Sequence, residues 1–281
     1  MTGAQALARG ARVLREAGIP DAATDARRLL SHALGIPPDR LTVDLPGDLP
    51  PAISDLYEEL LARRAKRAPV SQIVGQRAFW GREFIVTEAV LDPRPETEVL
   101  VASALEEPFA RVLDLGTGSG CILISLLADR PLPTGVGVDL SGKALAVARR
   151  NAEHHRLGDR ASFLQGNWFD GLTERFDLIV SNPPYIAIDE MPGLEPEVRD
   201  WEPRLALTDE GDGLNAYRAI LAGAAARLAP GGRLMVEIGP TQAEAVAAIG
   251  RGHGLGAPEV RPDLDGRARV CLFRAPEALV P

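Results

Sequence analysis

The tetrapeptide Asn182-Pro183-Pro184-Tyr185 follows an apolar run, Phe176 to Ser181, that predicts a strand. Two prolines after a strand could simply form a rigid turn. However, an amide or aromatic amine nitrogen is a poor nucleophile, because its lone pair is delocalised. The Asn182 side-chain oxygen and the Pro183 carbonyl can accept its N–H groups, since proline brings no competing donor. With Tyr185 stacked on the planar group, this motif predicts that a planar nitrogen is oriented for alkylation.

A second motif, Leu113 to Cys121, places glycines between a predicted strand and a predicted helix. Glycines let a backbone approach a ligand closely, but such a loop can also be a plain tight turn. Cys121 stands where a dinucleotide fingerprint requires glycine, and Asp114 would repel a pyrophosphate. Because a carboxylate can anchor an ammonium group, the motif favours S-adenosylmethionine. The predicted cofactor contacts are Gly116, Thr117, Gly118, Ser119 and Gly120.

Two further segments complete the predicted cofactor site. Asp139 ends the strand after the glycine motif, where a carboxylate can accept both ribose hydroxyls. It could also cap the next helix, a role that Ser141 can fill instead. After another strand, Asn167 or a backbone amide can bind the edge of an adenine, and Trp168 can cover its face. Trp168 can equally be a core residue.

The elements that position these residues alternate between strand and helix after residue 110. Strands are expected at 111–115, 135–139, 161–165, 176–181, 233–237 and 267–273, with helices between them. Such alternation predicts an α/β fold with a mostly parallel sheet, which binds ligands beyond the carboxyl ends of its strands. The first 68 residues read as helices, and Phe79 to Val86 around Gly81 predict a β-hairpin. Thr97 is expected to cap the helix that follows it.

Composition limits the classes of partner. The 281 residues carry a net charge of −8, which argues against non-specific binding to nucleic acid phosphates. No run is long and apolar enough to cross a bilayer, and no signal peptide is visible, so a cytoplasmic protein is expected. Cys121 and Cys271 lack metal-ligand spacing and read as buried thiols, so no metal site is expected.

The glycine motif, Asn182 to Tyr185 and the upstream Arg94-Pro95-Glu96-Thr97-Glu98 together resemble the HemK/PrmC family. The likeness continues in Pro69 to Gly75, in Trp168-Phe169 and in Val198 to Pro203. The resemblance implies a class I methyltransferase fold: a Rossmann-like, mostly parallel seven-stranded sheet with a small N-terminal helical domain and a β-hairpin connector. The expected domains are residues 1–68 (helical, substrate recognition), 69–92 (connector) and 93–281 (methyltransferase).

The family methylates the side-chain amide of glutamine in the Gly-Gly-Gln motif of class I peptide chain release factors, so the resemblance implies those partners. It implies that Asn182, Pro183, Pro184 and Tyr185 hold the glutamine, and that Asn182 also contacts the cofactor. It puts Arg94, Glu96 and Thr97 near the methionine end of the cofactor. Asn167 departs from the aspartate that is frequent at this position, although asparagine can also accept from an adenine amino group. A monomer is expected.

Three alternatives differ from this interpretation. An adenine N6 methyltransferase on DNA or RNA explains the Asn182 to Tyr185 motif equally well, but it predicts a basic recognition region, and only the short run Arg63 to Arg67 is basic here. A cofactor-binding module without catalysis leaves that motif unexplained. A nicotinamide dehydrogenase is disfavoured by Cys121.

Overall fold

The computed structural model describes residues 1–45 and 47–275, which divide into two compact units. Unit 1 consists of Met1–Gln76 together with Glu195–Trp201. Unit 2 consists of Arg77–Leu194 together with the chain from Glu202 onward. No helix in the described part of the chain has the length and apolar character needed to cross a bilayer.

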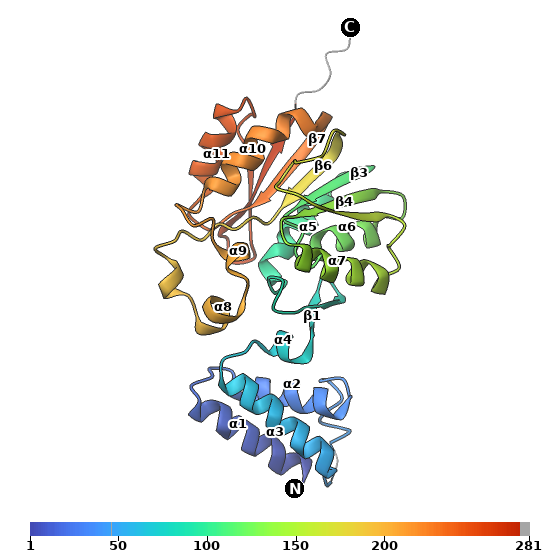
Figure 1. The fold of residues 1–281 in the computed structure, drawn as a ribbon, viewed down its shortest axis with the longest axis vertical. Helices are drawn as coiled ribbons and strands as arrows, with labels where there is room; N and C mark the ends of the chain where they lie inside the picture. The colour runs from blue at the N-terminus through green and yellow to red at the C-terminus, as the bar shows by residue number, and fades with distance from the viewer. Residues whose placement is uncertain (46, 276–281) are drawn as a thin grey trace. The chain divides into compact units, whose positions relative to one another are not determined.

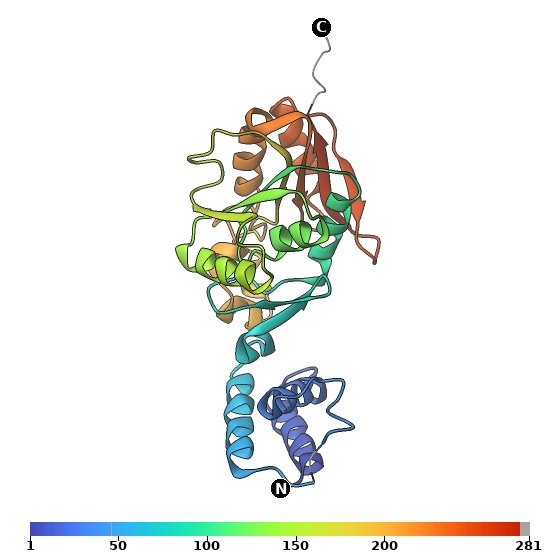
Figure 2. The same ribbon diagram turned by 90° about the vertical axis from the view of Figure 1, so that its right-hand side faces the viewer.

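Unit 1 is a helical bundle with its own core (Figures 1 and 2). Its helices are α1 (Gly3–Glu16), α2 (Ala22–Leu34), α3 (Pro51–Ala65), α4 (Val70–Val74) and α8 (Pro196–Trp201). The core is built from apolar residues at helical spacing, among them Leu14, Leu29, Leu30 and Leu61. Tyr57 is fully buried with them, and its hydroxyl donates to the Ala26 carbonyl oxygen (3.1 Å).

Helix α8 joins this bundle although it is more than a hundred residues away in sequence. The buried Arg64 of α3 binds Asp25 of α2 (Nε–Oδ2, 2.7 Å) and Glu197 of α8 (Nη1–Oε1, 2.9 Å). The Gln72 side-chain amide donates to the Trp201 carbonyl oxygen (3.1 Å). One guanidinium therefore links three helices of unit 1, an attachment that no pattern in the sequence predicts.

Unit 2 is built on a seven-stranded sheet in the order β5-β4-β3-β6-β7-β9-β8. The strands from β5 to β7 are parallel, and β9 and β8 are antiparallel to their neighbours. The bounds are β3 (Arg111–Leu115), β4 (Thr134–Asp139), β5 (Ala161–Gln165), β6 (Phe176–Ser181), β7 (Leu228–Glu237), β8 (Glu259–Pro262) and β9 (Ala268–Arg274). The fold class predicted from the sequence is confirmed. The edge strand β8 was not predicted because its side chains are mostly exposed and lack an apolar signal.

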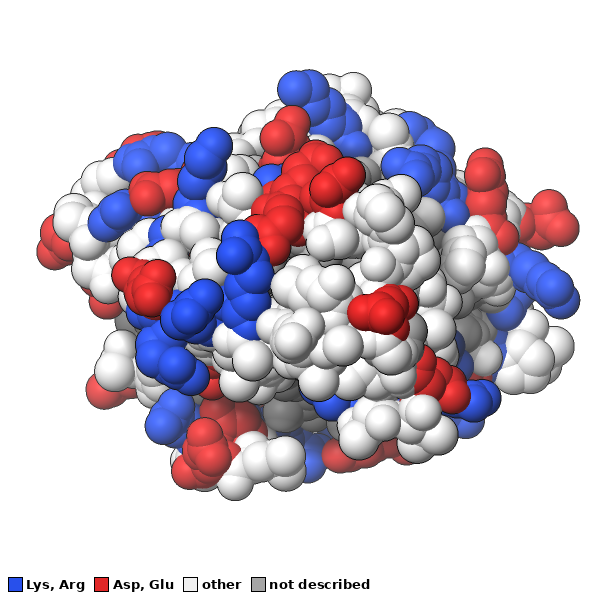
Figure 3. Space-filling view, turned by 90° about the horizontal axis from the view of Figure 1, so that it is seen from below, with Lys and Arg blue, Asp and Glu red and all other residues white. Residues whose placement is uncertain are grey.

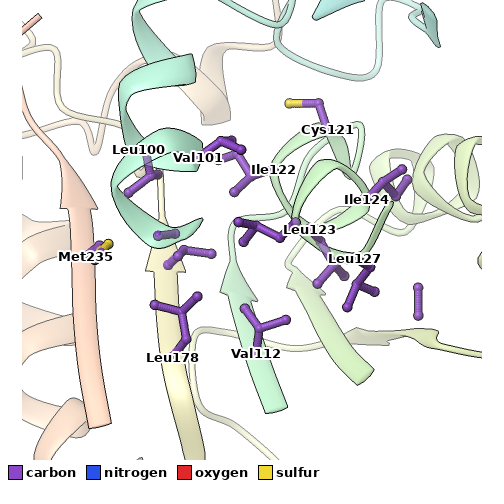
Figure 4. Packing of buried hydrophobic residues seen from close by; sticks show 14 of the residues in the cluster. Leu100, Val101, Val112, Cys121, Ile122, Leu123, Ile124, Leu127, Leu178 and Met235 are labelled. Atoms are coloured by element: carbon purple, nitrogen blue, oxygen red, sulfur yellow. The ribbon is translucent and has the colours of Figure 1, made fainter. Parts of the chain in front are cut away.

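Helices cover both faces of the sheet, because successive strand residues point to opposite sides. On one face, α5 (Glu98–Leu105), α6 (Cys121–Asp129) and α7 (Gly142–His154) pack over residues such as Val112 and Leu178 (Figure 4). On the other, α10 (Asn215–Arg227) and α11 (Ala243–Gly252) pack over Leu113 and Ile179. Both free thiols, Cys121 and Cys271, are buried, as expected.

The remaining elements are short. β1 (Gln76–Phe79) and β2 (Arg82–Ile85) form the predicted hairpin. Trp80 and Gly81 both have positive φ (50° and 67°), as a two-residue turn of this hand requires. The others are η1 (Pro95–Thr97), η2 (Met191–Gly193) and α9 (Arg204–Leu207).

Candidate functional site

The glycine motif and the Asn182 motif begin side by side at the same edge of the sheet. β3 and β6 are parallel neighbours, with Leu115 opposite Ser181. From β3 the chain continues to β4 and β5 on one side, and from β6 it continues to β7 on the other. The two motifs therefore follow the strand ends at the point where the strand order reverses, which is where open α/β sheets bind ligands.

A cavity of about 500 Å³ opens at this point of unit 2. The predicted site residues that line it are Gly116, Thr117, Gly118, Ser119, Asp139, Asn167, Trp168, Asn182 and Pro184. Gly120, Pro183 and Tyr185 are not among its lining residues. The walls also include two segments that were not predicted as cavity residues: Glu88 to Pro93, and Pro203, Leu205 and Ala206. For the first segment, the apolar run Ala89-Val90-Leu91 before the Arg94 motif was the sequence feature that could have indicated a cavity wall.

The Asp139 carboxylate organises the glycine loop. The Gly118 N–H donates to its Oδ2 (2.9 Å), and the Ser141 N–H donates to its Oδ1 (2.8 Å). Ser141 is the residue that caps α7, because its hydroxyl accepts from the Ala144 N–H (3.2 Å). Burial raises the pKa of Asp139. Each carboxylate oxygen keeps capacity for a further donor, which a ribose hydroxyl can supply.

Asp114 lies behind this loop. Its side chain is fully buried and is not part of the cavity wall. The Thr117 hydroxyl donates to Oδ2 (2.7 Å), while Oδ1 is buried without a hydrogen-bond partner. Burial raises the pKa of Asp114 to about 7. The Asp114 carboxyl therefore holds Thr117 of the glycine loop in place.

We expect Asp114 to make unfolding depend on pH. The pKa of Asp114 is about 7 when folded and about 3.9 when unfolded, so its contribution to stability is present below pH 4 and is lost as the pH rises towards 7. Asp114→Asn cannot ionise, so its stability relative to the parent chain should rise by about 2 kcal/mol between pH 5 and pH 7. Urea unfolding in a Trp201→Phe background makes fluorescence report on unit 2. Burial also raises the pKa of Glu202 and of Glu237 to about 7, but these two carboxyls titrate in both chains and cancel in the difference. A difference that is constant with pH would contradict the assignment.

Trp168 combines the two roles that the sequence left open. It packs against the core under α10, and it also lines the cavity. Its φ of 51° is unusual for a bulky residue. A Cβ on Gly116 would lie 3.8 Å from its ring, so the indole lies next to the glycine loop.

The residues of the Asn182 motif differ in how they face the cavity. Asn182 lines it, and its Nδ2 donates to the Thr97 hydroxyl (3.1 Å). Pro183 is buried. The Tyr185 ring packs against the core, and its hydroxyl forms a hydrogen bond with Glu237. Burial raises the pKa of Tyr185 to about 12. Of the four residues in the motif, Asn182 presents a polar side chain to the cavity.

The Arg94 motif lies at the same cavity. Arg94 lines it and donates through Nη2 to both oxygens of the buried Glu202 (2.9 and 2.7 Å). Burial raises the pKa of Glu202 to about 7. Glu96 is exposed and is not part of the wall. Thr97 forms no side-chain cap on α5, contrary to expectation, because its hydroxyl is engaged with Asn182.

These groups fit S-adenosylmethionine. The cavity has the size of a small-molecule site, its wall is mostly apolar, and the Asp139 carboxylate faces it at a strand end. The glycine loop, the reversal of strand order and Asn182 beside it define the class of the protein. It is a class I S-adenosylmethionine-dependent methyltransferase.

Comparison with known proteins identifies the branch of this class. Residues 5–75 match the PrmC N-terminal domain, and residues 87–192 match the methyltransferase small domain. The chain is 56% identical to the release factor glutamine methyltransferase of Cereibacter sphaeroides over 99% of this chain and 100% of the relative. It is 44% identical to the protein of the same name from Rhodospirillum rubrum, over 95% and 83%. The chain belongs to the release factor glutamine methyltransferase family.

Solved structures share the fold at low identity. A methyltransferase from Pyrococcus furiosus superposes with a TM-score of 0.54 at 16% identity, over 79% of this chain and 99% of that one. The hMettl16 catalytic domain superposes with a TM-score of 0.58 at 17% identity, over 78% and 82%. These likenesses support the fold of the sheet and its helices.

Proposed function

We propose that this chain transfers the methyl group of S-adenosylmethionine to the side-chain amide nitrogen of the glutamine in the Gly-Gly-Gln motif of class I peptide chain release factors. One observation carries the proposal: Asn182 and Pro184 line the same cavity as the glycine loop and Asp139. A planar amide held by Asn182 therefore lies in the cavity that fits the methyl donor. The names of the relatives agree with this substrate.

The residues of this chain contribute binding and orientation. S-adenosylmethionine, when bound, supplies a methyl group on a sulfonium. The glycine loop, Asp139, Asn167 and Trp168 hold it. The Asn182 Oδ1 and the Pro183 carbonyl accept the two N–H groups of the glutamine amide, so its lone pair points at the methyl group. No strong base is needed beforehand, because the alkylated nitrogen is acidic and loses its proton afterwards.

The helical residues 1–68 recognise the release factor, residues 69–92 connect, and residues 93–281 carry out transfer. This assignment is supported by the match of residues 5–75 to the PrmC N-terminal domain. The protein acts as a monomer in the cytoplasm.

The alternative acceptor is an adenine amino group in DNA or RNA. The net charge of −8 disfavours it. On the face shown in Figure 3, basic and acidic side chains are interleaved. Several arginines are also paired with carboxylates, among them Arg9 with Glu58 and Arg40 with Asp44.

A transfer assay with labelled S-adenosylmethionine tests the proposal. The acceptors are wild-type release factor, release factor with the Gly-Gly-Gln glutamine changed to alanine, and duplex DNA. Label in the wild-type factor that disappears in the alanine variant supports the proposal. Label in DNA and none in either factor would replace it with the adenine alternative.

Cofactor affinity provides a second test. Asp139→Ala removes the acceptor for two loop N–H groups and for the ribose hydroxyls, so the Kd for S-adenosylmethionine should rise about 30- to 100-fold. Ser141→Ala is the matched control: losing the cap should destabilise α7 by about 1 kcal/mol and leave the Kd within about twofold. Isothermal titration measures both. Equal Kd values for the two variants would exclude Asp139 from the cofactor site.

A further inference from the structure

Thr97 occupies a position that its helix does not explain. It is the last residue of η1, its side chain is buried, and it makes no side-chain cap on α5. Its hydroxyl instead accepts from Nδ2 of Asn182, 85 residues further along the chain (3.1 Å). The hydroxyl is therefore committed to the side chain that faces the cavity.

Glu237 is a second polar neighbour of this hydroxyl. It is the last residue of β7, which pairs with β6 so that Val236 is opposite Ser181, the residue before Asn182. The carboxyl is fully buried, and burial raises its pKa to about 7, whereas hydrogen bonding to the Thr97 and Tyr185 side chains lowers it. Its Oε2 is buried without a hydrogen-bond partner. A buried carboxyl group at this strand end therefore interacts with the hydroxyl of Tyr185, from the Asn182 motif, and with the hydroxyl of Thr97, from η1.

The protons in this chain of groups have one consistent arrangement when Glu237 is ionised. A carboxylate only accepts, so the single hydroxyl proton of Thr97 points at Glu237. The Thr97 oxygen then has only lone pairs left for Asn182, and a lone pair binds the NH₂ end of the amide. The Oδ1 end must face away from Thr97. A flipped amide would leave Oδ1 against an oxygen with no proton to offer.

We propose that Thr97 and Glu237 are positioning residues for methyl transfer, which fix the Asn182 amide so that Oδ1 faces the acceptor nitrogen. This rests on the proposed function, because it supposes an acceptor whose N–H groups need an oxygen at Asn182. Thr97 lines the cavity, whereas Glu237 is not part of its wall, and in this proposal both act through Asn182. Their contribution is to keep one amide orientation populated before the substrate arrives, so that no reorganisation is needed at the moment of transfer.

The test compares Thr97→Val with Thr97→Ser. Valine keeps the shape and removes the hydroxyl, whereas serine keeps the hydroxyl. With release factor as acceptor, Thr97→Val should lower kcat about 10- to 100-fold, because a misplaced orienting group costs that much. The KM for release factor should stay within about twofold. Thr97→Ser keeps the hydroxyl at the cavity wall, so it should keep kcat within about threefold and the Kd for S-adenosylmethionine within about twofold. A residue that only supports the fold would change the melting temperature together with kcat.

Glu237→Gln is the second variant, and it keeps the size of the side chain. Its amide can donate to the Thr97 oxygen and so removes the preference for one proton arrangement; kcat should fall at least about fivefold. The double variant Thr97→Val/Glu237→Gln should be no slower than Thr97→Val alone by more than about threefold, since both act through one hydrogen-bond chain.

The outcomes separate the two proposals. If the wild-type chain methylates release factor and both single variants do so at the wild-type kcat, the positioning role is overturned and the proposed function stands. If the wild-type chain transfers no methyl group to release factor, the proposed function fails and this inference fails with it. Slow transfer by Thr97→Val with restored transfer by Thr97→Ser supports the positioning role.

Discussion

Asn182→Ala should lower kcat for release factor methylation by about 10²- to 10³-fold, or about 3 to 4 kcal/mol of transition-state stabilisation. Asn182 lines the cavity from the end of β6, and its Nδ2 is already engaged with Thr97, so Oδ1 is the end available to an acceptor. Alanine removes the oxygen that aligns the glutamine amide. Single-turnover kinetics with saturating cofactor measure this step separately from binding.

Asn167→Ala is the matched control for this substitution, because Asn167 lines the same cavity and is proposed to contact the adenine. It should weaken S-adenosylmethionine binding and change the single-turnover rate by no more than about threefold. Equal losses of rate for the two alanine variants would show that Asn182 supports cofactor binding and does not orient the acceptor.

Arg64→Met should destabilise unit 1 by about 3 to 5 kcal/mol. The Arg64 guanidinium is buried between Asp25 and Glu197. Methionine fills the space of the stem but leaves the buried Asp25 without its arginine, and leaves Glu197 with Arg67 alone (3.4 Å). Trp201 packs against the core of unit 1, so its fluorescence in a Trp80→Phe/Trp168→Phe background reports on the unfolding of this unit. Hydrogen exchange in residues 195–201 should accelerate at the same time.

Arg9→Met provides the comparison for Arg64. Arg9 also pairs with a carboxylate at short distance, Glu58 (2.6 Å), but both side chains are well exposed to solvent. Its removal should cost less than about 1 kcal/mol. If the two variants unfolded at the same urea concentration, the buried Arg64 cluster would not be what holds α8 to the bundle.

Local patterns in the sequence were sufficient for the sheet and for the loops at its strand ends. Apolar runs followed by Asp139 or by Asn182 predicted strands whose carboxyl ends meet at one edge, and the cavity lies there. Where the sequence allowed either Asp139 or Ser141 as the helix cap, hydrogen bonding in the folded chain selects Ser141. The sequence cannot tell which of the two residues caps the helix, since both side chains can accept a hydrogen bond from a helix N-terminus.

The fold class, the glycine loop and the Asn182 motif could all be predicted from the sequence, because each depends on residues that are near neighbours in the chain. The folded chain was needed to show that the Thr97 hydroxyl binds Asn182 and does not cap its own helix, that Glu237 interacts with Thr97 and Tyr185, and that Glu197 pairs with Arg64 of the helical bundle. Those contacts join residues from 52 to 140 positions apart (Glu237−Tyr185 and Glu237−Thr97). Their partners are chosen by strand register and by the requirement that buried polar groups be paired, and neither leaves a local pattern in the sequence.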